Sequence, residues 1–137
     1  MPIQLAAIVP HPPIILPEIG QGQERAIRAT ISAYREIAKR VRQINPETMV
    51  ILSSHATSYA DYFHISPGKK ARGDLKRFGA RQVQVSAIYD EEFALALEQN
   101  AKRAGLPAGT KGEREKALDH GTLIPLTFLA ERELPCQ

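Results

Sequence analysis

The architecture of this chain follows from the run Leu5-Ala6-Ala7-Ile8-Val9-Pro10-His11-Pro12-Pro13-Ile14-Ile15, in which apolar residues lead into a histidine set among three prolines. Proline fixes φ, has no N–H to give a sheet and pushes the preceding residue away from helix. We therefore predict a buried strand over residues 3–9, with His11 on a stiff loop just past its end. A histidine held there suits chemistry, and a structural histidine hydrogen-bonded to the backbone fits the same pattern.

An amphipathic helix and a second apolar strand are predicted next. From about residue 21 to residue 44 the apolar residues recur at steps of three and four, which is the helical period. They are Ile27, Ile31, Tyr34, Ile37, Ala38, Val41 and Ile44. Asn45-Pro46 ends that helix, and residues 48–53 have the composition of another buried strand. Strand, helix and strand make a βαβ unit, whose crossover is almost always right-handed.

The rest of the chain is predicted to add one more long strand and two helices. The elements expected there are a long loop over residues 54–80 with a short strand at Tyr62–Ser66, a strand over Arg81–Tyr89, a helix that Asp90 caps and Gly105 ends, and a helix from Thr122 to Glu131 with Pro125 in its first turn. We expect a single α/β domain over residues 1–137. Its predicted form is a three-layer α/β/α arrangement with a mostly parallel central sheet, truncated at the C-terminus.

Length and composition indicate one globular domain. The chain has 137 residues, of which 43% are hydrophobic and 24% charged, and its net charge is +3. No apolar run is long enough to span a bilayer and no signal peptide is visible, so we expect a cytoplasmic protein without a membrane partner. The single cysteine, Cys136, excludes an internal disulfide and a cysteine-based zinc cluster.

One basic stretch could attract an acidic ligand. Lys69, Lys70 and Arg72 are followed by Lys76 and Arg77. No aromatic residues for base stacking and no nucleic-acid motif accompany them, so no nucleic-acid partner is expected. The stretch is interpreted as a solvated or substrate-facing loop.

A second histidine stands where it could meet His11. His55 follows the strand predicted over residues 48–53, and ligands of parallel sheets bind beyond the carboxyl ends of the strands. Strands joined by one crossover are usually neighbours, about 4.8 Å apart. His11 and His55 can thus converge on one point, as two imidazole ligands of a metal must. Two unrelated structural histidines remain the alternative.

The two other histidines differ in their surroundings. His120 lies in Asp119-His120-Gly121 before a predicted helix, where it can be aimed at a cleft or can be an exposed residue of a helix cap. His64 alternates with apolar neighbours and is interpreted as structural.

Three motifs around these histidines resemble the class III extradiol ring-cleavage dioxygenase superfamily, whose type enzyme is the catalytic subunit of protocatechuate 4,5-dioxygenase. The motifs are Ala7-Ile8-Val9-Pro10-His11-Pro12-Pro13, Leu52-Ser53-Ser54-His55-Ala56 and Ala117-Leu118-Asp119-His120-Gly121-Thr122-Leu123-Ile124-Pro125-Leu126. The stretch from Tyr59 to Gly68 is similar to the AMMECR1-associated and Memo-like branch. The resemblance covers essentially the whole chain, with the motifs in the right order.

The resemblance implies a non-haem Fe(II) centre. His11 and His55 match the two histidine ligands of a two-histidine, one-carboxylate triad, although zinc or copper would also suit two imidazoles. His120 matches a second-sphere histidine that hydrogen-bonds bound oxygen or substrate. The implied reaction is cleavage by O₂ of an aromatic ring next to the paired hydroxyls of a catechol.

The chain departs from the family pattern because two of the family's site residues have no match in it. Family members are considerably longer, and their carboxylate ligand and second acid/base histidine have no match here. Glu18, Asp61 and Asp119 are conceivable oxygen donors, but none matches that carboxylate. We therefore expect an N-terminal fragment with an exposed apolar sheet edge and a homo-oligomer or a partner protein. Activity of these residues alone stays open, and the alternative is a non-catalytic Memo-like metal- or protein-binding module.

Overall fold

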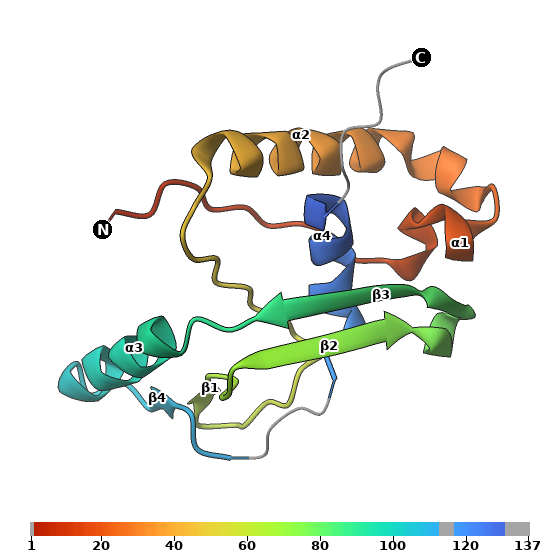
Figure 1. Cartoon of the computed structure of the whole chain (residues 1–137). Helices are drawn as coiled ribbons and strands as arrows, with labels where there is room; N and C mark the ends of the chain where they lie inside the picture. The colour runs from red at the N-terminus through yellow and green to blue at the C-terminus, as the bar shows by residue number, and fades with distance from the viewer. Residues whose placement is uncertain (1, 113–116, 131–137) are drawn as a thin grey trace.

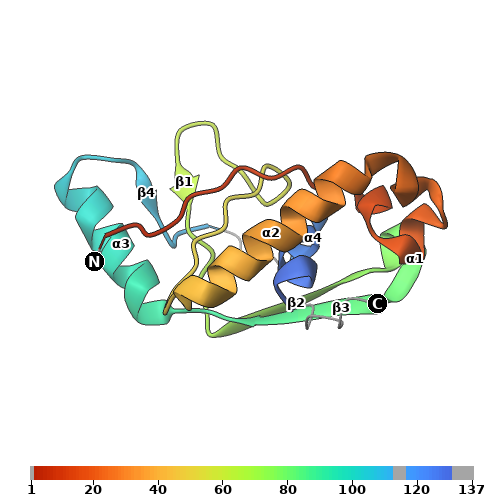
Figure 2. The same cartoon turned by 90° about the horizontal axis from the view of Figure 1, so that it is seen from above.

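A computed structural model describes residues 2–112 and 117–130 of the chain. Its helices and strands, with η for 3₁₀-helices, are η1 (Pro13–Ile15), α1 (Pro17–Gly20), η2 (Gln23–Ile27), α2 (Arg28–Ile44), β1 (Phe63–His64), β2 (Lys70–Leu75), η3 (Lys76–Phe78), β3 (Ala80–Ile88), α3 (Glu91–Arg103), β4 (Ala108–Gly109) and α4 (His120–Ala130). Helix α4 lies between α2 and the β2–β3 hairpin and contacts both (Figure 1). Seen from above, α2 crosses over α4, while α3 lies at the far end of the hairpin (Figure 2).

The α/β class is confirmed, with two small sheets in the described part of the chain. Strands β1 and β4 are parallel, and Phe63 pairs with Ala108. Strands β2 and β3 are antiparallel from the Lys70–Ile88 pair onward, with an irregularity after Asp74. The mostly parallel central sheet that we predicted is thus represented here by one short parallel pair beside a longer antiparallel one.

The strands predicted over residues 3–9 and 48–53 are not formed. Neither segment has a ladder partner among the described residues. Ile3 is 88% exposed and Leu52 is 87% exposed, so most of the apolar side chains that suggested buried strands are not covered, although Val9 packs against the core. A strand needs a hydrogen-bonded neighbour as well as an apolar composition, and composition alone does not reveal whether that neighbour is present.

The predicted loop over residues 54–80 contains a strand that sequence reasoning missed. Strand β2 occupies its last part, and Gly79, with φ of 83°, turns the chain into β3. The short strand near Tyr62–Ser66 is confirmed as β1, and the strand over Arg81–Tyr89 is confirmed as β3. Its alternation is confirmed as well, because Val83, Val85 and Ala87 are less exposed than their neighbours.

The three predicted helices are all present. Asp90 accepts a hydrogen bond from the Phe93 N–H at 2.9 Å and so caps α3. Helix α4 begins at His120, two residues earlier than predicted, which places Pro125 inside the helix rather than in its first turn. Glu131 and Cys136 lie outside the described residues. Among the helices described, none is long and apolar enough to cross a membrane.

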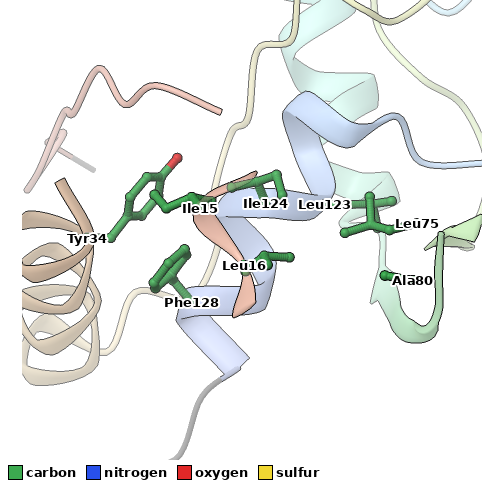
Figure 3. Packing of buried hydrophobic residues seen from close by; sticks show 8 residues of the cluster. All are labelled: Ile15, Leu16, Tyr34, Leu75, Ala80, Leu123, Ile124 and Phe128. Atoms are coloured by element: carbon green, nitrogen blue, oxygen red, sulfur yellow. The ribbon is translucent and has the colours of Figure 1, made fainter. Parts of the chain in front are cut away.

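The core is built around α4. Figure 3 shows Tyr34 of α2 beside Phe128 at one end of the cluster and Leu75 and Ala80 of the hairpin at the other, with residues of α4 between them. The complete buried cluster is Ile15, Leu16, Tyr34, Leu75, Ala80, Leu123, Ile124 and Phe128. This packing fixes the end of α4 that carries His120 against the hairpin.

Candidate metal centre

His11 is held on a stiff loop, as predicted. Pro10 precedes it, Pro12 follows it, and the chain then enters η1 and the buried side chains of Ile15 and Leu16. The Tyr34 hydroxyl donates a hydrogen bond to the Pro10 carbonyl. The Tyr34 ring stacks on Phe128 with centroids 4.4 Å apart, and burial raises the pKa of this tyrosine to about 12. Helix α2 therefore fixes the backbone next to His11.

His120 is the first residue of α4, and the segment before it is attached to the hairpin. Asp119 caps the helix by accepting a hydrogen bond from the Thr122 N–H at 3.2 Å. The Leu118 N–H donates to the Arg72 carbonyl of β2 at 3.1 Å. Gly73 allows this approach, because a Cβ there would lie 2.6 Å from the Leu118 carbonyl oxygen.

The three histidines His11, His55 and His120 meet at one place. The Nε2 atoms of His11 and His55 are 2.8 Å apart. The ring centroids of His55 and His120 are 4.1 Å apart, and those of His11 and His120 are 5.7 Å apart. His55 is exposed and the other two are partly buried, so solvent reaches the cluster.

These rings suit a metal ion of the first transition series. Two nitrogen ligands about 2.1 Å from a metal and about 90° apart lie roughly 3.0 Å from each other, and the observed 2.8 Å is close to that spacing. Potential ligand atoms of all three histidines lie within 4.8 Å of one another. The Nε2 atoms of His11 and His55 form the close pair. The longer distances within the cluster therefore involve His120, whose ring lies beside that pair.

Comparison with known proteins shows the family of this chain. Residues 5–137 match the family described as the catalytic LigB subunit of aromatic ring-opening dioxygenase. The chain belongs to the LigB family. Protein CA_C1420 of Clostridium acetobutylicum is 30% identical to this chain over 129 residues. The match covers 89% of this LigB chain and 28% of that protein, so the chain spans just over a quarter of its relative's length.

The environment of this LigB cluster favours a neutral His120. Burial lowers the pKa of His120 below its ordinary value, and the neighbouring rings of His55 and His11 lower it further. Asp119 opposes this shift, and the charge of Arg77 adds to it. An imidazole in this state can accept a proton near neutral pH.

Other sequence candidates lie apart from the cluster. His64 is in β1, contacts the Tyr59 ring, and its Nε2 has no hydrogen-bond partner among the described residues. Within those residues no carboxylate joins the three histidines as a metal-binding group, so Glu18 and Asp61 are not brought to them.

Sequence reasoning missed Phe78. Its ring lies 5.2 Å from the His120 ring, centroid to centroid, and it is 40% exposed. It follows Arg77 in η3, at the tip of a hairpin whose first strand and turn lie in the loop predicted over residues 54–80. The glycine at position 79 after a short alternating segment is the signal that could have revealed this turn.

A hollow of about 310 Å³ lies elsewhere, beside α1, η2 and α2. Arg25, Arg28 and Phe128 are among the residues that line it, and none of the clustered histidines is. The hollow is therefore separate from the histidine cluster.

Proposed function

We propose that this LigB domain holds Fe(II) through His11 and His55 and contributes to extradiol cleavage of a catechol by O₂. The observation that carries the proposal is the 2.8 Å approach of the two Nε2 atoms, with the His120 ring beside them. Membership of the LigB family supports the reaction class. Zinc and copper are the competing ions, because imidazole suits them also.

The roles proposed for the residues follow from their placement. Bound Fe(II) would supply open coordination positions for the catechol oxygens and O₂. His120, whose lowered pKa keeps it neutral near pH 7, would accept a proton from a catechol hydroxyl. Phe78 presents a half-exposed aromatic ring next to His120, against which the ring of a substrate could pack.

The ligand set of the family pattern includes a carboxylate, and within the described residues none joins the histidine cluster. We propose that full activity requires such a donor in addition to the two imidazoles. On this view the two imidazoles without that donor hold a metal more weakly than a complete triad does, and turnover is slow or absent.

The test is anaerobic loading with Fe(II), addition of protocatechuate and then of O₂, with absorbance recorded for a yellow ring-opened product. The longer Clostridium protein is treated in the same way for comparison. Bound iron is measured separately by a chelator assay in wild type and in His11→Ala, His55→Ala and His64→Ala. His64 is the matched control, because it is a histidine outside the cluster.

We expect His11→Ala and His55→Ala to lose the bound iron and His64→Ala to keep it. Equal iron content in all four proteins would remove the proposed metal site. Iron binding without ring opening in either this chain or its longer relative would leave a metal centre but refute the extradiol reaction.

A non-catalytic binding module is the second candidate, favoured by the exposed apolar segments over residues 3–8 and 49–52. Their backbones have no ladder partner among the described residues, so a second copy of the chain could pair with them as an added strand. Sedimentation should then show a concentration-dependent dimer that Ile8→Lys abolishes while the metal content is unchanged. A monomer at all concentrations would contradict this pairing.

A further inference from the structure

A chain of hydrogen bonds joins the backbone of His55 to the start of α4. The His55 N–H donates to Ser53 Oγ at 3.2 Å. The Ser53 hydroxyl in turn donates to Oδ1 of Asp119, which lies 66 residues further along the sequence. Two histidine-bearing segments that are remote in the chain are therefore connected through one carboxylate.

The same carboxylate fixes where His120 begins its helix. Oδ1 of Asp119 also accepts the Thr122 N–H, and Oδ2 accepts the Thr122 hydroxyl at 2.9 Å. Both carboxylate oxygens are thus used within the protein, so Asp119 is poorly placed to act as the missing oxygen donor to a metal. These hydrogen bonds outweigh the effect of burial and keep the pKa of Asp119 below its ordinary value.

Steric fit makes this connection tight. A Cβ at Gly121 would lie 2.5 Å from Ser53 Oγ, 2.9 Å from Asp119 Oδ1 and 3.2 Å from His55 Cδ2. Only a residue without a side chain allows the first turn of α4 to approach the 53–55 turn this closely. The spacing of the two rings therefore depends on hydrogen bonds and on close packing at the same point.

We propose that Asp119 is a positioning residue that, through Ser53, sets the distance between the His55 and His120 rings. It contacts neither the metal nor the substrate in this role. It acts by holding two backbone segments in register, and metal sites generally lose affinity when the groups that orient their ligands are removed. The inference rests on the proposed function only for its metal-binding readout.

Two variants break the connection from opposite sides. Ser53→Ala removes the hydroxyl and leaves the helix cap intact. Asp119→Asn keeps a good capping residue but replaces one acceptor oxygen by an amide donor. Asp90→Asn is the matched control, because Asp90 also accepts a backbone N–H and a hydroxyl, those of Phe93 and Thr48, at a helix start away from the histidines.

The experiment combines two readouts on the folded proteins. Nuclear Overhauser contacts between the ring protons of His55 and His120 are recorded in the metal-free state, and Co(II) affinity is measured from its visible absorption. We expect Ser53→Ala and Asp119→Asn to lose the ring contacts and to weaken Co(II) binding by about tenfold. The double variant should be no worse than either single one, and Asp90→Asn should resemble wild type.

The outcomes distinguish the positioning role of Asp119 from the proposed metal site. Ring contacts and Co(II) affinity unchanged in both single variants would overturn the positioning role, as would an equal loss in Asp90→Asn. Wild-type protein that takes up no Co(II) would count against the metal site, while the ring contacts would still decide the role of Asp119.

Discussion

Replacing Tyr34 by phenylalanine removes one hydroxyl group from the point where α2 meets the loop that carries His11. The side chain is 4% exposed and its ring remains stacked on Phe128, so the variant loses the bond to the Pro10 carbonyl without opening a large cavity. A hydrogen bond of this kind contributes about 0.5–1.5 kcal/mol net. Because Pro10 is exposed and water can replace the donor, we expect a loss near 1 kcal/mol at pH 8.

The same substitution should behave differently at high pH. Below pH 10 the phenol is protonated in both the folded and the unfolded chain, so the stabilisation by Tyr34 is constant. Between its unfolded pKa near 10 and its folded pKa of about 12, the unfolded chain ionises while the folded chain does not. The free energy of unfolding of the wild type should then fall by about 1.4 kcal/mol per pH unit relative to Tyr34→Phe.

Urea unfolding followed by far-UV circular dichroism at pH 8 and pH 11 measures both effects. Wild type should be the more stable protein at pH 8, and the two should be about equal or reversed in order at pH 11. All other titrating groups are shared, so they cancel in the difference. The same difference in stability at both pH values would refute the assignment of a buried, hydrogen-bonded phenol to Tyr34.

Three further substitutions test other parts of the structure. Gly121→Ala should weaken Co(II) binding and lower the free energy of unfolding by about 1–3 kcal/mol through overpacking. A wild-type Co(II) affinity together with a wild-type free energy of unfolding would show that a methyl group fits at the start of α4. Phe78→Ala should hydrate His120 and move its lowered pKa upward, as followed by ring-proton shifts, whereas Phe63→Ala, at an exposed ring in β1, should not. An unmoved pKa in Phe78→Ala would exclude that ring as a source of the burial. Asp90→Ala should lower the free energy of unfolding by about 1 kcal/mol through loss of the α3 cap, and thermal melts that match wild type would contradict this.

Local signals in the sequence predicted the helices and the β3 strand well. The periodic apolar face of α2 and the cap at Asp90 act within a few residues, so the pattern contains the information needed. Strand β2 was missed because its residues, Lys70 to Leu75, are largely polar and have little strand character until β3 pairs with them. The segments over 3–9 and 48–53 show the reverse error, since apolar composition was present but the part of the chain that the structure describes offers them no partner strand.

The convergence of His11, His55 and His120 was predicted from the positions of the histidines in the chain and from family resemblance. What could not be predicted was how they are held. Nothing in the sequence around Tyr34 or Ser53 marks their hydroxyl groups as important. Their roles depend on hydrogen bonds to Pro10, 24 residues from Tyr34, and to Asp119, 66 residues from Ser53. The sheet geometry used to bring His11 and His55 together is not what unites them in the described structure; the loops and α4 do so.

The prolines around His11 have a consequence for the entropy of ligand binding. Ordering the backbone of one residue costs roughly 1–2 kcal/mol, and at His11 fixed φ angles at Pro10 and Pro12 have removed much of that freedom before any ligand arrives. His55 is exposed, in a turn without proline, and is held by a hydrogen bond and by packing against the start of α4. The cost of ordering the site therefore falls mainly on one of its two sides, and the rate at which a bound ion leaves should be governed by the motion of the His55 turn.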